Sequence, residues 1–199
     1  MSELTTLRAL SGLPAEAASL ADSTLIMIDC QNTYTEGVMK LEGVQAALDE
    51  AATLLDRARS AGIPIIHIQH DAGEGSPYDV RAPIGQIVDR VAPKGGDEPV
   101  IVKNFPNAFV QTDLEERLRR AGSSNLVLAG FMTHMCVNST ARGAFSLGYA
   151  PTVVAAATAT RALPGSTGTV EAEALQAASL AAVADLFGVV VSRTADIPD

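Results

Sequence analysis

The chain has 199 residues, of which 47% are hydrophobic and 19% are charged, and its formal net charge is −9. This length suits one globular domain, so we expect residues 1–199 to form a single domain with a sizeable core. The negative charge disfavours nucleic acid and anionic lipid as partners, because both attract basic surfaces. Tryptophan is absent and aromatic residues make up 4% of the sequence, so small aliphatic residues must supply most of the core.

The sequence contains no pattern that directs a chain to a membrane or an export route. Residues 1–20 lack the continuous apolar core of a signal peptide, and no apolar run approaches the roughly 20 residues that span a bilayer. The two cysteines, Cys30 and Cys136, are too few for a disulfide framework and suit a reducing compartment. We therefore expect a cytoplasmic protein.

The first half of the chain alternates apolar runs with an amphipathic stretch. Residues 24–28 form an apolar run that is typical of a buried strand. An amphipathic helix is predicted at 44–61, where apolar residues recur on one face and a glycine follows. Strands are predicted at 63–68 and 100–102. The long loop 71–99 separates these two strands, and a loop of that length in a compact domain is more often functional than neutral.

The second half of the chain repeats this alternation of helices and strands. A short helix is predicted at 112–120, where Thr112 and Glu115 have the spacing of a capping box. The elements predicted after it are, in order, a strand at 125–129, a helix at 134–147, a strand at 152–156, an alanine-rich helix at 171–186 and a strand at 189–191.

Apolar strands separated by helices are typical of a parallel sheet that is covered on both faces. We therefore predict a three-layer α/β/α sandwich, Rossmann-like, with a doubly wound and mostly parallel six-stranded sheet. Ligands of such folds bind beyond the carboxyl ends of the strands, so the residues after each strand are candidates for a site. A nucleotide-binding module is disfavoured, because no glycine-rich phosphate-binding motif follows a strand.

Three reactive side chains follow three different predicted strands. Asp29 follows the first strand, Lys103 the third and Cys136 the fourth. Each has an ordinary structural interpretation when it is considered alone. Asp29 could form a turn or a helix cap, Lys103 could simply reach solvent, and Cys136 could be a small buried thiol. One cleft at the carboxyl edge of the sheet can collect all three, and the set then predicts a catalytic site.

The predicted chemistry of this set is nucleophilic attack by a thiolate. Cys136 falls in the first turn of a predicted helix, where free backbone N–H groups and the helix dipole are expected to lower the pKa of a thiol. Asp29 can take the thiol proton and deliver it to a leaving amine, while Lys103 offsets the negative charge. The thiolate can attack a carbonyl, and backbone N–H groups at the helix start can bind the oxyanion.

The segments around these residues resemble the isochorismatase-like cysteine hydrolases, a superfamily that includes nicotinamidases, N-carbamoylsarcosine amidases and ureidoacrylate amidases. The resemblance covers about residues 23–159 in the expected order and includes Ile28-Asp29-Cys30-Gln31-Asn32, Val102-Lys103-Asn104 and Gly130 to Val137. It implies the triad Asp29, Lys103 and Cys136 on a three-layer α/β/α fold. It also implies a cis peptide between Phe131 and Met132, with the N–H groups of Met132 and Cys136 forming the oxyanion hole.

Other residues near the strand ends are candidates for the pocket. Gln31 could bond a polar substrate group or satisfy the backbone of a turn, and Tyr78, Phe105 and Phe109 could line the pocket or pack in the core. His70 with Asp71 lacks the ligand spacing of the nicotinamidase metal site, so we expect no metal and no other cofactor.

His134, two residues before Cys136, would point away from the thiol, which favours a structural or interface role. Cys30 alternates with Asp29 and is expected to be a core thiol.

The sequence therefore predicts a cysteine-dependent amidohydrolase that cleaves a C–N bond of a small molecule through an acyl-enzyme. One alternative is hydrolysis of a vinyl ether such as isochorismate, a branch in which the aspartate acts as the acid and no cysteine is used. Another is a catalytically idle, oligomeric binding protein. The resemblance and the alanine-rich helix also suggest that the protein forms a homo-oligomer, a dimer or a tetramer.

Overall fold

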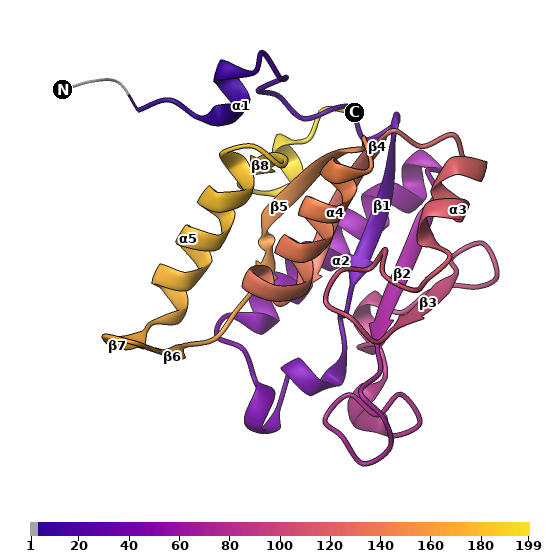
Figure 1. Ribbon diagram of the computed structural model, residues 1–199. Coiled ribbons are helices and arrows are strands. Elements are labelled where there is room, and N and C mark those ends of the chain that lie inside the picture. Colours follow the sequence, from indigo (N-terminus) through magenta and orange to yellow (C-terminus); the bar gives the residue numbers. More distant parts are fainter. Residues whose placement is uncertain (1–3) are drawn as a thin grey trace.

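The protein is described by a computed structural model that covers residues 4–199 (Figure 1). A parallel six-stranded sheet forms its centre, with strand order β3-β2-β1-β4-β5-β8. This arrangement confirms the predicted doubly wound sheet. The strands are β1 (Ser23–Ile28), β2 (Ile65–His70), β3 (Val100–Lys103), β4 (Asn125–Phe131), β5 (Ala150–Ala159) and β8 (Val189–Val191).

Helices cover both faces of the sheet and bury alternate residues of each strand. Helix α2 (Val44–Ala61) covers one face and packs on Leu25 and Met27 of β1. The opposite face, which includes Ile26 and Ile28, is covered by α3 (Leu114–Arg120), α4 (Asn138–Ser146) and α5 (Ala172–Ala184). In Figure 1, α4 and α5 lie in front of the sheet and α2 behind it. The three predicted layers are therefore confirmed.

Smaller elements complete the described chain. A short helix α1 (Leu7–Leu10) lies near the C-terminal segment, since Arg8 N–H donates to the Asp185 carbonyl. Strands β6 (Leu163–Gly165) and β7 (Gly168–Val170) form an antiparallel hairpin before α5.

Two predicted boundaries near helices are wrong for identifiable reasons. The helix predicted at 134–147 begins instead as a wide π-helical turn, Thr133–Val137, and only then becomes α4. In this turn Val137 N–H donates to the carbonyl of Met132, five residues earlier. The capping box predicted at Thr112 does not form, because α3 begins after Asp113 and the Thr112 hydroxyl donates to the Ala108 carbonyl.

The direction in which the chain winds reverses between β1 and β4. From β1 the chain proceeds to β2 and β3 on one side, and from β4 to β5 and β8 on the other. The loops after β1 and β4 therefore lead in opposite directions from the carboxyl ends of these strands, and doubly wound folds bind ligands at such a switch point. Asp29 directly follows β1, and Cys136 follows β4 by five residues.

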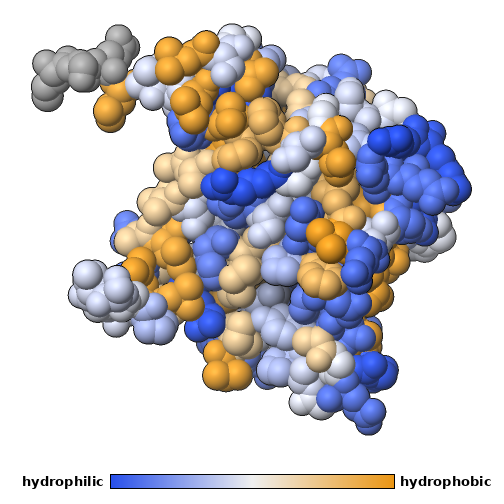
Figure 2. Space-filling model, viewed as in Figure 1, coloured by the Kyte–Doolittle hydropathy of each residue, from blue (hydrophilic) through white to orange (hydrophobic). Residues whose placement is uncertain are grey.

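The surface in Figure 2 shows how polar and apolar side chains are distributed on one face. Charged residues of α3 form a hydrophilic area, while hydrophobic side chains gather over α1, where Leu4, Leu7 and Leu10 are exposed. Within residues 4–199, no helix combines the length and hydrophobicity needed to cross a membrane.

Candidate active site

Asp29, Lys103 and Cys136 meet at the carboxyl edge of the sheet. The Nζ atom of Lys103 lies 2.7 Å from Oδ2 of Asp29 and 3.4 Å from Sγ of Cys136. All three residues are buried, with exposed fractions of 0% for Asp29, 1% for Lys103 and 5% for Cys136. The structure therefore brings the three predicted residues together, in a setting where water screens their charges only weakly.

Local backbone geometry positions the carboxylate and the thiol. Asp29 has a φ of +49°, a left-handed conformation that turns the chain sharply out of β1 and that aspartate tolerates better than most residues. Gly130 is the register partner of Ile28, and a Cβ atom at this position would collide with the Ile28 carbonyl. Only glycine lets β4 approach β1 this closely, so Gly130 sets the distance between the two segments that carry Asp29 and Cys136.

His70 is the third neighbour of the Lys103 ammonium, and the sequence did not predict this contact. Its Nδ1 atom lies 3.1 Å from Lys103 Nζ, and the two residues are register partners on β2 and β3. Burial, followed by the charge of Lys103, lowers the pKa of His70. The ring is therefore neutral at physiological pH and accepts a hydrogen bond from the ammonium. The same strand-end rule that selected Asp29 could have selected His70, because it is the last residue of β2.

The carboxylate of Asp71, the other group considered for a metal site, is bonded within the loop that follows β2. Its Oδ1 atom accepts hydrogen bonds from the backbone N–H of Gly73 and the guanidinium of Arg81. In the part of the chain that the structure describes, no three His, Cys, Asp or Glu side chains are grouped to hold a metal ion.

The thiol of Cys136 differs from the sequence expectation in its protonation. Burial and the charge of Asp29 raise the pKa of this thiol, the charge of Lys103 lowers it, and the result is a pKa of about 12. The prediction that the helix start lowers this pKa is thus wrong for the resting site. A buried thiolate is not solvated by water, so ionising the sulfur costs more free energy than it does at the surface. The proton stays on sulfur until a reaction step removes it.

Asp29 is the group placed to remove that proton. Burial raises the pKa of its carboxyl group, while the charge and hydrogen bond of Lys103 lower it. The carboxylate forms an ion pair with Lys103, and the thiol of Cys136 is close enough for a hydrogen bond with Asp29 to affect the pKa of both groups. A buried carboxylate with unused acceptor capacity can take a proton from the neighbouring thiol.

The segment between β4 and the π-helical turn offers a free backbone donor. The peptide bond between Phe131 and Met132 is cis, as the family resemblance implied. The Met132 N–H donates no hydrogen bond to any group within residues 4–199. Met132 directly precedes the π-helical turn Thr133–Val137 and lies four residues before Cys136 in the chain.

Tyr78 comes from the long loop and packs against His70 at the edge of the triad. Its ring makes edge contacts with His70 and Tyr34, at centroid distances of 5.2 Å and 5.8 Å. Burial raises the pKa of Tyr78 above its ordinary value, and the charges of Cys136 and Asp29 raise it further. Tyr34 is 1% exposed and was not predicted; it packs on Phe131 and so supports the segment that leads to Met132.

The predicted pocket role of Gln31 is not supported by its contacts. Its side chain is fully buried, and its amide bonds only to backbone groups. Nε2 donates to the carbonyls of His70 and Gly85, and Oε1 accepts from the His70 N–H. The amide therefore links the loop 71–99 to the end of β2. Both of its N–H groups are used in these bonds, so neither can donate to a substrate.

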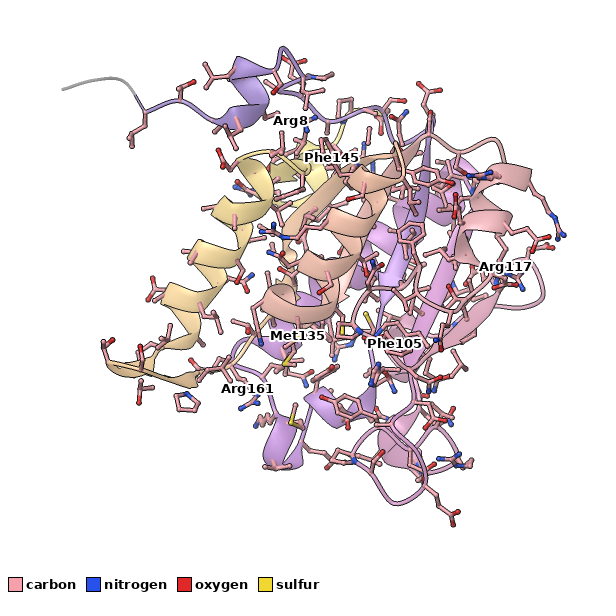
Figure 3. All side chains as sticks on the ribbon, viewed as in Figure 1. Arg8, Phe105, Arg117, Met135, Phe145 and Arg161 are labelled. Atoms are coloured by element: carbon pink, nitrogen blue, oxygen red, sulfur yellow. The ribbon has the colours of Figure 1, made fainter. Side chains whose placement is uncertain are left out.

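Phe105 and Phe109 lie at opposite ends of the sheet. Phe105 lies at the carboxyl end of the sheet, together with Met135, and 41% of its surface is exposed (Figure 3). Phe109 instead stacks on Tyr149 at a centroid distance of 5.9 Å, and Tyr149 directly precedes β5 at the amino end of the sheet. The predicted pocket role of Phe109 is therefore not supported, because its ring is engaged at the opposite end.

The remaining candidates occupy structural positions. Cys30 packs in the core on the α2 face, and burial, followed by the charge of Asp29, raises the pKa of its thiol. The Nδ1 atom of His134 lies 2.6 Å from the hydroxyl of Thr160, a residue that follows β5. His134 is thus held against β5 by this bond and is half-buried.

Comparisons with known proteins agree with this geometry. Residues 23–195 match the Isochorismatase domain. The chain is 36% identical over 190 residues to the secreted isochorismatase effector Isc1 of Verticillium dahliae, covering 95% of this chain and 97% of that protein. It is 31% identical to the ureidoacrylate amidohydrolase RutB of Stutzerimonas stutzeri, over 73% of this chain and 75% of that protein.

Among solved structures, the chain is similar to an isochorismatase from Pseudomonas putida KT2440. The TM-score is 0.94 at 39% sequence identity, and the match covers 98% of this chain and 100% of that structure. Since one relative is named as secreted and others are not, the cytoplasmic location stays a prediction. The domain match, the fold and the grouping of Asp29, Lys103 and Cys136 show that this chain belongs to the isochorismatase family of hydrolases.

Proposed function

We propose that the protein is an amidohydrolase that cleaves a C–N bond of a small molecule through a covalent intermediate on Cys136. The observation that carries this proposal is the contact of one buried ammonium, Lys103, with both a carboxylate and a thiol. A thiol is not needed for acid-catalysed cleavage of a vinyl ether, but it is the nucleophile of amide hydrolysis through an acyl-enzyme. The similarity to an enzyme named ureidoacrylate amidohydrolase supports the same reaction class.

The first half of the reaction forms the acyl-enzyme. Asp29 takes the proton from Sγ of Cys136 while the sulfur attacks the amide carbon, which forms the C–S bond and moves the carbonyl electrons onto oxygen. The N–H groups of Met132 and Cys136 bind this oxyanion. When the intermediate collapses, the C–N bond breaks and Asp29 returns its proton to the leaving nitrogen, which departs as ammonia or an amine.

The second half of the reaction releases the acid. Asp29 takes a proton from a water molecule, the water oxygen attacks the thioester carbon, and the C–S bond then breaks. The proton on Asp29 returns to the sulfur, so the site regains a neutral thiol and a carboxylate. The positive charge of Lys103 offsets that of Asp29 in the resting site and that of the sulfur as the C–S bond breaks.

One observation keeps vinyl-ether hydrolysis as a second candidate. Burial raises the pKa of Asp29, and a carboxyl group with a raised pKa can act as a general acid at neutral pH. That reaction would depend on Asp29 and would be indifferent to the loss of the Cys136 sulfur. The two candidates therefore differ in what they expect from one variant, Cys136→Ala.

The test is a panel of small primary amides and ureido acids, assayed by ammonia release with wild type and Cys136→Ala. We expect hydrolysis of at least one compound by wild type and a loss of about 10³-fold or more in Cys136→Ala. Cys30→Ala, which removes the other buried thiol, is the matched control and should retain activity. Full turnover by Cys136→Ala on a compound that wild type hydrolyses would overturn the proposal.

A further inference from the structure

We propose that two copies of this chain associate by exchanging the β6–β7 hairpin. The hairpin of each copy lies, in this dimer, in a groove between α2, β5 and α5 of the other copy. The proposed contact goes beyond the proposed function and is independent of it, because it uses no group of the triad. Two features of the chain carry the proposal: a hairpin that projects from the body, and a groove beside the base of that hairpin.

The β6–β7 hairpin projects from the molecule at the end of α5 (Figure 1). Residues 164–170, which form most of it, are all exposed. Within residues 4–199, its two strands pair only with each other, in a sheet separate from the central one. A two-stranded hairpin alone is at most marginally stable in water, and its strands leave backbone N–H and C=O groups free at both edges. The hairpin is therefore a segment that a docking partner would stabilise.

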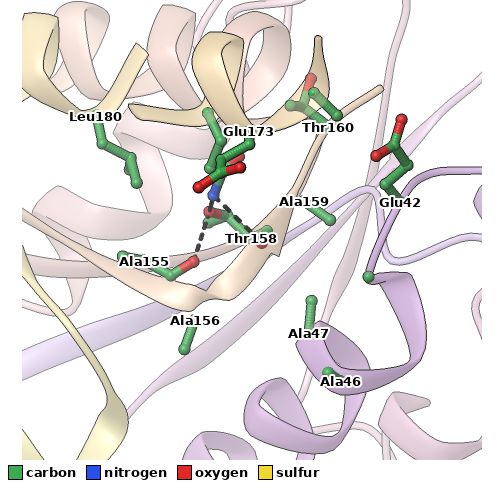
Figure 4. A pocket seen from close by; sticks show the side chains of 13 residues that line it. Glu42, Ala46, Ala47, Ala155, Ala156, Thr158, Ala159, Thr160, Glu173 and Leu180 are labelled. Atoms are coloured by element: carbon green, nitrogen blue, oxygen red, sulfur yellow. Dashed lines mark hydrogen bonds between the residues drawn. The ribbon is translucent and has the colours of Figure 1, made fainter. Parts of the chain in front are cut away.

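The groove lies directly beside the base of the hairpin. Its volume is about 510 Å³, and its lining comes from the start of α2, the second half of β5 and one side of α5 (Figure 4). Alanine is the commonest lining residue, so much of the surface is smooth and apolar. Thr160 and Ala172, which both line the groove, stand on either side of the hairpin in the chain.

The groove contains a buried hydrogen-bond acceptor without a donor. Nε2 of Gln176 donates to the hydroxyl of Thr158 at 2.9 Å, which holds the side-chain amide against β5. Oε1 of the same amide is buried and accepts no hydrogen bond from residues 4–199. The carboxylates of Glu42 and Glu173 add further acceptors to the lining. A buried acceptor without a donor costs free energy, so the groove favours an occupant that brings N–H or O–H groups.

The hairpin of a second copy supplies such donors. Ser166, Thr167 and Thr169 are exposed and carry hydroxyl groups, and the free edges of both strands add backbone N–H groups. Residues 162–170 contain no charged side chain, so this segment can enter a groove lined by two glutamates without repulsion. Two whole chains, each with a net charge of −9, repel one another. An uncharged segment is therefore the part of a second copy that fits here.

The position of the hairpin beside the groove makes the contact reciprocal. In a two-fold dimer the same surface of both copies meets, so each contact occurs twice. Residues 165–168 at the tip do not line the groove of their own chain. A copy that places its hairpin in the groove of its partner thus keeps its own groove open for the partner's hairpin. The association then closes at two copies.

The solvent side of α5 can enlarge this contact. Four exposed alanines lie on one face of the helix, at the spacing of successive turns: Ala174, Ala177, Ala178 and Ala181. Their short side chains let the backbone of a second chain approach α5 closely. The hairpin and the groove remain the specific part of the interface, because they carry its donors and acceptors.

The first measurement is the molar mass of the intact protein, by size-exclusion chromatography with light scattering over a range of concentrations. We expect wild type to form a dimer. Thr167→Glu should raise the dissociation constant about tenfold or more, because it places a carboxylate beside Glu42 and Glu173. Adding Glu173→Lys to this variant should recover most of the affinity. Thr53→Glu, on the exposed side of α2 outside the groove, is the matched control and should leave the constant unchanged.

The second measurement identifies the two surfaces that meet. Thr167→Cys and Ala156→Cys are prepared as separate proteins, since Ala156 is an exposed residue of the groove. The native thiols, Cys30 and Cys136, are buried. Diamide is added to the mixed proteins: an S–S bond forms between the new thiols, and their two hydrogens reduce the N=N bond of diamide to a hydrazine. We expect a covalent dimer on a non-reducing gel. Thr53→Cys mixed with Ala156→Cys is the control and should give none.

Several results would overturn the exchange of hairpins. A wild type that stays monomeric at every concentration has no such dimer. A dimer that Thr167→Glu leaves unchanged forms through another surface, and one that Thr167→Glu and Thr53→Glu weaken equally responds only to added charge. A cross-link that forms equally in the control mixture reports random collision. None of these results bears on the reaction at Cys136, so failure of the dimer contact is distinct from failure of the proposed function.

Discussion

The Nδ1 atom of His70 lies 3.1 Å from the Nζ atom of Lys103, which gives this ammonium three neighbours: His70, Asp29 and Cys136. A lysine ammonium has three N–H donors, so each donor has one group to face. Because burial and the charge of Lys103 lower the pKa of His70, the ring is neutral and its Nδ1 can accept. The histidine thus holds Lys103 in the orientation that serves the carboxylate and the thiol.

Replacing His70 should leave the Lys103 side chain less well positioned, although His70 is not among the groups that would contact the scissile bond of the substrate. We expect His70→Phe to lower the free energy of unfolding by about 2 kcal/mol, since one N–H of a buried ammonium loses its acceptor. Amide hydrolysis should fall in parallel. His70→Asn, which keeps an acceptor, should recover part of both, as measured by urea unfolding and ammonia release. Wild-type stability in His70→Phe would contradict the assigned contact.

The rate of alkylation of Cys136 by iodoacetamide should rise with pH throughout the range from 7 to 10. Burial and the charge of Asp29 raise the pKa of this thiol to about 12, so the thiolate fraction grows tenfold per pH unit without a plateau in that range. A plateau below pH 9, measured by intact mass at timed intervals, would show that the thiolate is already formed in the resting protein.

Asp29→Asn should separate thiol reactivity from catalysis. Because the Asp29 charge raises the pKa of Cys136, its removal should lower that pKa and make alkylation at pH 8 faster than in wild type. Hydrolysis should nevertheless be lost, since no base remains to transfer the proton. The variant leaves Lys103 buried without its counter-ion, so we expect a loss of about 3 kcal/mol in stability, and folding is checked by circular dichroism. Slower alkylation would contradict the prediction.

Gly130→Ala should be far more destabilising than Gly148→Ala. Both glycines have a positive φ, of +119° and +89°, so an alanine is strained at each. A Cβ at position 130 would also collide with the Ile28 carbonyl, whereas nothing lies within 4 Å of a Cβ at position 148. We expect about 1 kcal/mol for Gly148→Ala and about 3 kcal/mol or more for Gly130→Ala, measured by urea unfolding. Equal losses would show that β4 can move away from β1.

Glu98→Gln should destabilise the protein in a pH-dependent way. Hydrogen bonds from Arg59 hold the pKa of Glu98 at about 2, well below its ordinary value of 4.5. A depressed folded-state pKa stabilises the protein above pH 4.5, and this stabilisation is lost as the pH falls towards 2. We expect Glu98→Gln to cost at most about 3 kcal/mol at pH 7 and clearly less at pH 3.

The matched control for Glu98 is Glu116→Gln, because its ion pair with Arg120 lies on the exposed surface of α3. That substitution should cost about 0.5 kcal/mol or less at either pH. Urea unfolding of both variants at pH 7 and pH 3 measures the difference. A cost of Glu98→Gln that stays constant with pH would show that the Arg59 contact does not act through the charge of Glu98.

The sequence by itself determined the layers of this protein and the edge at which its site lies. Apolar runs of strand length, separated by amphipathic stretches, have few stable solutions other than a covered parallel sheet. In such a sheet all carboxyl ends lie at one edge, so the sequence alone places Asp29, Lys103 and Cys136 in one group. The boundaries near Thr112 and His134 were less well predicted, because single hydrogen bonds decide where helices begin.

Only the tertiary structure decided the electrostatics and the contacts of the site. The pKa of Cys136 is raised and not lowered, because segments far apart in the sequence exclude water from the sulfur. The side-chain amide of Gln31 donates a hydrogen bond to the backbone of a loop more than 50 residues away. The ring of Phe109 stacks on Tyr149 at the end of the sheet opposite to the site.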